Sequence, residues 1–194
     1  MQRILPGIVA AVLLSAPGVA HSQDRVRLEV VPGAVFSTET FADSDLGNGL
    51  GVGAHISVRV LPHLAPYFGW SVHGFRVETS FAGPDVDIEE TGYTFGLRFE
   101  HPMAGAASPA LMLKAGGTYN HIEIENAAGD LVADSGHGFG WEAGAGVAFP
   151  LGARWHITPG VRFRSLKRDI DVGDVRTPVT LRYVAAEVGF SRSF

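Results

Sequence analysis

The sequence predicts an all-β chain that folds as an antiparallel up-and-down transmembrane β-barrel of about eight strands. Three observations lead to this fold class: an N-terminus that looks like an export signal, apolar residues at every second position, and connections that alternate between short and long. Alternation with a period of two is typical of strands that have one apolar face. Strands in hydrocarbon must also close into a ring, because an open edge would leave backbone groups without partners.

The N-terminus has the features of a secretory signal peptide. Arg3 supplies a positive charge, and the apolar stretch at residues 4–14 is too short to span a bilayer. Small residues shortly after this stretch suit cleavage. We therefore expect residues 1–22 to be a signal peptide and residues 23–194 to form one β-barrel domain, because no linker divides them.

Composition excludes several other classes of protein. The chain has no cysteine, so disulfides cannot stabilise it, although export usually leads to an oxidising compartment. The net charge is −5 and the basic residues are scattered, which argues against a nucleic-acid partner. After the leader, no apolar stretch approaches the roughly 20 residues of a membrane helix. A membrane-bound mature chain must therefore cross as strands.

The first four strands are predicted from alternating residues between turn-forming Gly, Pro, Asn and Asp. In 26–36, Val, Leu and Phe alternate with Arg and Glu, and in 49–60 an aliphatic series alternates with Gly, His and Ser. In 68–77 the apolar series changes phase at Phe75, which predicts either a bulge or a partly apolar inner face. In 92–100, aromatic residues and Leu alternate with Gly, Thr, Arg and Glu.

The other four strands follow from the same pattern. In 111–119, Leu, Ala and Tyr alternate with Lys, Gly and Thr, and in 138–149, Phe, Trp, Ala and Val alternate with glycines and one Glu. In 154–164, Trp, Ile, Val and Phe alternate with Arg and His. In 183–194, Val, Ala and Phe alternate with Tyr, Glu and Ser. An even number of strands places both termini at the same end of the barrel.

The predicted connections are of two kinds. Tight ones lie at residues 62–64, 101–107 and 150–153, and longer, acidic ones lie at residues 38–48, 80–88, 122–136 and 167–178. Short turns on the periplasmic side, opposite longer outer loops, are typical of bacterial membrane barrels.

Alternation alone leaves open whether the apolar face points inward, as in a soluble barrel, or outward into lipid. The polar face favours lipid, because it consists mostly of Gly, Ser and Thr and lacks the many Lys and Glu of a solvated surface. Small residues and paired charges suit a narrow lumen, which they would plug. We expect a lumen ion-pair network from these residues: Arg59, Arg98, Glu100, Lys114, Glu142, Arg162, Arg164 and Glu187.

The whole mature region resembles the OmpA/OmpX-like group of small bacterial outer-membrane β-barrel proteins. The resemblance is based on the signal peptide, the alternating strands and the final segment from Tyr183 to Phe194, which is similar to the terminal aromatic strand read by the barrel-assembly machinery. It implies export to the bacterial outer membrane, with outer-membrane lipid and that machinery as partners. It also implies that Phe194 is an assembly signal. Arg192 departs from the pattern, because it falls on the lipid-facing series.

Patterns for catalysis and metal binding are weak. His55 and Ser57 have a spacing that resembles lipid A deacylases of the PagL type, but both belong to the lumen-facing series. Asp43 and Asp45 suit a solvated acidic loop better than a calcium site. The histidines show no zinc-binding spacing. We therefore predict no catalytic residue, metal or cofactor.

The function expected from these features is that of a non-enzymatic outer-membrane protein. Its barrel would anchor surface loops for envelope integrity or for binding and adhesion. A small pore and a lipid-modifying enzyme remain as alternatives.

Overall fold

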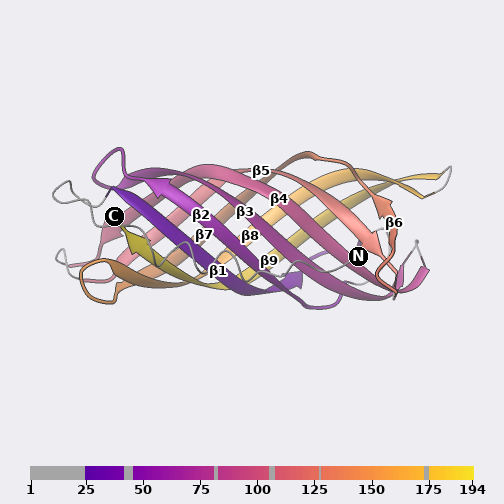
Figure 1. Cartoon of the computed structure of the whole chain (residues 1–194), viewed down its shortest axis with the longest axis horizontal. Coiled ribbons are helices and arrows are strands. Elements are labelled where there is room, and N and C mark those ends of the chain that lie inside the picture. Colours follow the sequence, from indigo (N-terminus) through magenta and orange to yellow (C-terminus); the bar gives the residue numbers. More distant parts are fainter. Residues whose placement is uncertain (1–24, 42–45, 81–82, 105–107, 127, 173–174) are drawn as a thin grey trace.

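A computed structural model describes residues 25–41, 46–80, 83–104, 108–126, 128–172 and 175–194. The predicted signal peptide and the loop carboxylates of Asp43 and Asp45 lie outside these ranges. Nearly all of the described chain is strand (Figure 1): β1 (Val26–Ser37), β2 (Gly49–Val58), β3 (Leu64–Ser80), β4 (Gly83–Pro102), β5 (Ala110–Glu125), β6 (Leu131–Asp134), β7 (Gly138–Pro150), β8 (Trp155–Val172) and β9 (Val175–Ser193). The described residues contain no helix long and apolar enough to cross a membrane.

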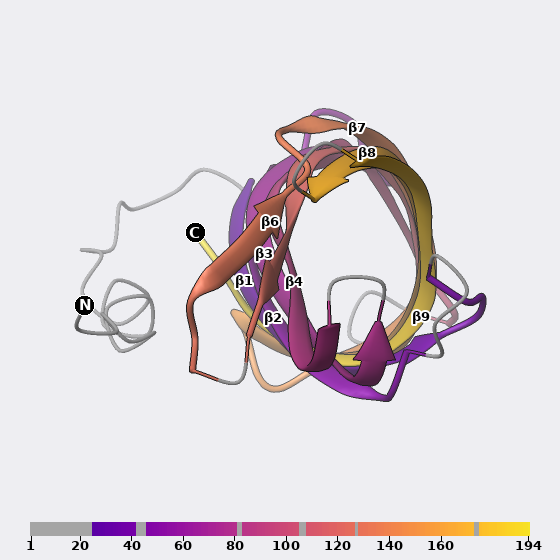
Figure 2. The ribbon, with the colours of Figure 1, turned by 90° about the vertical axis from the view of Figure 1, so that its right-hand side faces the viewer.

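Eight of these strands close into the predicted antiparallel barrel. They follow the order β4-β3-β2-β1-β9-β8-β7-β5, and β5 pairs with β4 to complete the ring. Figure 2, which looks along the barrel, shows this closed wall. The additional strand β6 lies in a connection predicted as loop and pairs with the distal part of β5. The predicted fold class and the eight-stranded ring are confirmed.

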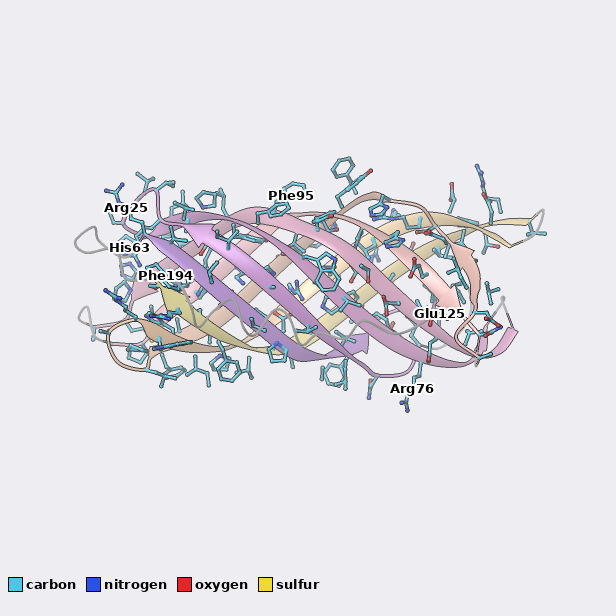
Figure 3. The ribbon with its side chains drawn as sticks, in the orientation of Figure 1. Arg25, His63, Arg76, Phe95, Glu125 and Phe194 are labelled. Atoms are coloured by element: carbon cyan, nitrogen blue, oxygen red, sulfur yellow. The ribbon has the colours of Figure 1, made fainter. Side chains whose placement is uncertain are left out.

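Both ends of the described chain lie at the same end of the barrel. The Val26 N–H donates to the Phe194 carbonyl at 3.2 Å, and the Phe194 N–H donates to the Val26 carbonyl at 2.8 Å. Figure 3 shows Phe194 and His63 at this end, which we call the terminal end, and Glu125 at the opposite, distal end. The short connections β2–β3, β4–β5 and β7–β8 therefore lie at the terminal end.

Large apolar side chains cover the outside of the terminal half. Trp70, Tyr93, Tyr119 and Phe139 occupy adjacent register positions on β3, β4, β5 and β7, and all four are exposed. We call these four residues the aromatic row. Leu and Val side chains lie between this row and a second group of aromatic residues near the terminal end: Phe99, Phe149 and Trp155. The apolar face of the strands thus points outward, as predicted for a barrel in lipid.

Several strands continue well past the aromatic row. β4 begins at Gly83, about nine residues earlier than predicted, and β8 and β9 remain paired as far as Val172 and Val175. The predicted boundaries are therefore wrong for these segments, which are mostly strand and not loop: 80–88, 122–136 and 167–178.

The error comes from a change in which face is apolar. On β4, Tyr93 and Phe95 point outward, whereas Val86 and Ile88 on the distal side are buried inside. On β3 the buried positions alternate strictly from Tyr67 to Phe75, so the bulge alternative is wrong and the partly apolar inner face is confirmed. The side chain of Val77 lies outside the described residues.

The barrel wall branches where β7 begins. β5 pairs with β7 as far as Asn120, opposite Gly138, and then pairs with β6 from Glu123 onward. Arg168 of β8 lies at this branch, and its guanidinium donates to the carbonyls of Asn120 at 2.9 Å and Phe139 at 2.9 Å, and also to that of Gly138. A side chain therefore caps the backbone carbonyls where the β5–β7 ladder ends.

Candidate functional site in the barrel lumen

The centre of the lumen holds a buried ion cluster around Arg164 of β8. One terminal nitrogen of Arg164 donates to both carboxylate oxygens of Glu90, at 2.8 and 2.9 Å, and the other donates to Glu142 at 2.6 Å. Arg164 and Glu90 are fully buried, and Glu142 is 2% exposed. Charge pairing compensates for removing these groups from water only if their remaining hydrogen-bonding capacity is also used.

Neutral side chains complete this cluster. The Tyr67 hydroxyl donates to Glu142 at 2.7 Å, and the Tyr183 hydroxyl donates to Glu90 at 2.7 Å. Glycine at positions 96 and 116 leaves room for the Tyr67 ring, because a Cβ at Gly116 would lie 2.6 Å from its hydroxyl. Small residues on β4 and β5 therefore allow a phenol from β3 to reach the centre of the barrel.

Arg162 extends the cluster toward the terminal end. Its guanidinium donates to Glu142 at 3.0 Å, lies 3.0 Å from the His73 ring nitrogen, and also pairs with Glu187 of β9. The opposite nitrogen of the His73 ring lies 2.8 Å from Glu90. The central cluster, which we define as Tyr67, His73, Glu90, Glu142, Arg162, Arg164, Tyr183 and Glu187, thus links five strands across the lumen.

A second group of charges lies closer to the terminal end. Glu29 accepts from Arg98 at 2.9 Å and from Lys114 at 2.8 Å. Glu100 accepts from Arg98 and from Arg27, each at 2.5 Å. We call these five residues the terminal cluster. It lies on β1, β4 and β5, whose inner faces meet at this level.

The structure brings together every predicted lumen residue except Arg59. Arg59 is exposed and lines the terminal mouth, and within the described ranges it joins neither cluster. The predicted set also lacks Glu90, which falls between the predicted loop at 80–88 and the predicted strand at 92–100. A signal was available, because Glu90 continues the inward series of Thr94 and Arg98 at even spacing along β4.

On the distal side of the central cluster the lumen is apolar. Phe75 and Tyr183 join the two regions, because their rings lie 5.2 Å apart and the Tyr183 hydroxyl reaches Glu90. Phe41, from the β1–β2 connection, is fully buried here. The distal core contains these residues: Val35, Phe41, Phe75, Val86, Ile88, Ile122, Ile124, Ala133, Leu166, Ile170, Val179, Leu181, Tyr183 and Ala185.

The space left in the charged part of the lumen is small. A cavity of about 250 Å³ opens at the terminal mouth beside Arg27, Arg59 and His156. Between the terminal and central clusters, the described residues leave a cavity of about 20 Å³ lined by Glu29, Lys114 and Glu187 among others. That volume is close to the room needed by one water molecule.

His55 and Ser57, the pair with deacylase-like spacing, are both buried on the lumen side of β2. A ring nitrogen of His55 lies 3.6 Å from Glu29, and the ring makes an edge contact with Tyr67. Neither side chain belongs to the exposed apolar face on the outside of the barrel. These contacts are typical of polar side chains that fill the lumen.

Phe194, the predicted assembly signal, lies at the terminal end beside Arg192. The Arg192 guanidinium lies 4.9 Å from the Phe194 ring centre and 5.5 Å from the Trp155 ring centre. Cation–π contacts of this kind let an outward arginine remain among aromatic side chains near the end of a barrel. The departure of Arg192 from the apolar series is thus accommodated at the rim.

Comparison with protein-family models gives no match, and comparison with curated proteins also gives none. Solved structures match in fold. Neisserial surface protein A (NspA) has 14% identity and a TM-score of 0.60, over 87% of this chain and 96% of its own. The outer membrane protein OprG from Pseudomonas aeruginosa has 16% identity and a TM-score of 0.58, over 90% of this chain and 97% of its own. Outer membrane protein AlkL has 15% identity and a TM-score of 0.55, over 93% of this chain and 95% of its own. The chain has the fold of small outer-membrane β-barrels, which confirms the predicted resemblance at the level of fold.

Proposed function

We propose that this chain is a non-enzymatic protein of the bacterial outer membrane whose closed barrel holds its distal strands and loops at the cell surface. The observation that carries the proposal is the double closure of the lumen, by buried ion pairs around Arg164 and by the apolar core beyond them. A barrel whose lumen is filled in this way suits a membrane anchor better than a pore. The surface it presents would serve envelope integrity or binding.

The outer surface supports a membrane location. Exposed aromatic residues border an apolar band at both of its edges, which is how barrels meet the two interfaces of a bilayer. AlkL, a protein of the same fold, was solved in lipid bilayers. We infer that lipid surrounds the terminal half and that the short turns face the periplasm. Delivery by the barrel-assembly machinery, with Phe194 as part of the signal, belongs to the same proposal.

Orientation can be tested by adding trypsin to intact cells. Arg176, which is exposed beside the tip of the β8–β9 hairpin, should be cleaved from outside. The matched control is Arg154, exposed in the short β7–β8 turn, which should be cleaved only after the outer membrane is opened. Cleavage at Arg154 in intact cells would contradict the proposed orientation.

The two alternatives can be tested separately. Single-channel recording of the refolded mature chain in planar bilayers should give no stepwise conductance under conditions in which an open porin gives it. Reproducible conductance steps would favour a pore. Mass spectrometry of lipid A should give the same masses from cells with and without the protein. A mass change that disappears in a His55→Ala variant would favour the enzyme.

A further inference from the structure

We propose that His121, Glu123 and Asp134 bind one divalent transition-metal ion of the Zn²⁺ type on the outer wall of the barrel. In this structure each of the three side chains offers one ligand atom, and these atoms all lie within 4.8 Å of one another. The sequence prediction of no metal site rested on local spacing. Asp134 joins the other two only through pairing between β5 and β6, so spacing could not reveal the group.

Strand geometry places the three side chains on one face. His121 and Glu123 are two residues apart on β5 and point outward, whereas Ile122 and Ile124 are buried inside. Glu123 lies directly opposite Asp134 in the β5–β6 register. The His121 Nδ1 atom lies 3.6 Å from a Glu123 oxygen and 3.2 Å from an Asp134 oxygen.

These separations fit a metal centre. Zinc bonds to imidazole nitrogen and carboxylate oxygen at about 2.0–2.2 Å, so neighbouring ligands of a tetrahedral site lie roughly 3.3 Å apart. One imidazole with two carboxylates favours Zn²⁺ or a similar ion over Ca²⁺ and Mg²⁺, which prefer oxygen ligands alone. With three protein ligands, a fourth position stays open to water or to another donor.

The surroundings orient two of the ligands. The Gly136 N–H donates to the same Asp134 oxygen at 2.8 Å, in a turn that the positive φ of Gly136, 64°, makes possible. The His121 ring stacks on His137, with ring centres 4.5 Å apart and an angle of 12° between the planes. Supporting contacts of this kind hold metal ligands in position before the ion binds.

The site also has an excess of negative charge. Glu123 and Asp134 are a like-charged pair directly across two strands, an arrangement that is unfavourable without a cation. A bound metal ion would relieve the repulsion between these two carboxylates. The metal does so with both carboxylates bound to it.

Calorimetric titration with ZnCl₂ tests the proposal on the full mature chain, refolded in detergent with any affinity tag removed. We expect one equivalent of Zn²⁺ to bind, and the affinity to fall at least tenfold in His121→Gln and in Asp134→Asn. The matched control is His101→Gln: the His101 ring lies beside His63 at the terminal end, with ring centres 4.9 Å apart and 54° between the ring planes, and His101 belongs to no metal-binding group among the described residues. This variant should bind Zn²⁺ like the parent.

A spectroscopic readout keeps the test independent of folding. Co²⁺ at the same site should give visible absorption bands of a low-coordinate centre in the parent and in His101→Gln, and these bands should be lost in His121→Gln. Circular dichroism would verify that each variant is folded. The proposal is overturned if the parent binds no Zn²⁺, if both site variants bind it like the parent, or if Ca²⁺ competes equally at the site.

Discussion

The terminal and distal halves of this barrel are built from the same strands but have opposite insides. At the level of the apolar outer band, the lumen contains arginines, glutamates and tyrosines. Beyond the aromatic row the outer positions become polar and the inside becomes an apolar core. On β5, for example, Tyr119 of the aromatic row points outward, whereas Ile122 and Ile124 beyond the row point inward.

The proposed membrane location explains this difference, because the medium outside the wall determines which face of a strand is apolar. Lipid accepts Leu and Phe on the outside and leaves polar groups to fill the lumen, whereas water requires the reverse. The backbone ladder continues through the change, because side chains alternate faces in either phase. The two halves should therefore respond differently to substitution.

The largest expected effect is the loss of Arg164 from the charged half. Arg164→Ala leaves Glu90 and Glu142 buried with too few cationic partners, and breaking a buried pair in this way costs about 3–5 kcal/mol. Urea-induced unfolding of protein refolded into lipid vesicles measures this loss.

The matched control removes an arginine from an exposed pair. Arg176 lies 2.9 Å from Asp171, and both side chains are more than half exposed. Arg176→Ala should therefore leave the free energy of unfolding close to that of the parent, because solvent screens an exposed pair. If the two variants lose similar stability, the ion pairs of the central cluster do not stabilise the barrel.

A smaller and more local effect is expected in the apolar half. Leu181→Ala removes a fully buried side chain from the distal core, at a cost of about 3 kcal/mol. Amide hydrogen exchange should become faster in the distal parts of β8 and β9, while amides beside the central cluster keep their protection. Equal acceleration at both levels would mean that the two halves unfold as one unit.

The smallest effect on stability is expected at the terminal rim. Deleting Phe194 removes one aromatic ring that lies beside Arg192 at the rim. The free energy of unfolding of protein refolded directly into detergent should therefore fall by less than about 1 kcal/mol. Insertion in cells should fall much more, because Phe194 is the expected assembly signal. Normal insertion, measured by heat-modifiable migration of membrane fractions, would remove the terminal strand from that role.

The sequence predicted the half of the barrel that has a single consistent pattern. The outward apolar series and most of the lumen charges, such as Glu142 and Arg162, follow from alternation alone. The distal strands were mistaken for loops because a change of phase at Glu90 and Asn120 looks like the end of a strand. The predicted lumen set lacks Glu90 for the same reason.

Other features depend on contacts between distant segments and have no local signal. Asp134 meets His121 only because the connection after β5 folds back as β6. Phe41 reaches the distal core from a connection whose composition suggests a solvated loop. Alternation predicts which face a residue occupies, but it does not predict which segment will cover that face.

The carbonyl cap made by Arg168 has a consequence for how this protein can vary. Because a guanidinium of β8 satisfies the carbonyls of Asn120, Gly138 and Phe139, the ladder of β5 and β7 is complete at that level without help from the segment between them. Because β6 begins at Leu131, barrel closure sets no fixed length for the β5–β6 connection between Glu125 and Leu131. An insertion there can diversify the exposed surface while the ring beneath keeps its register.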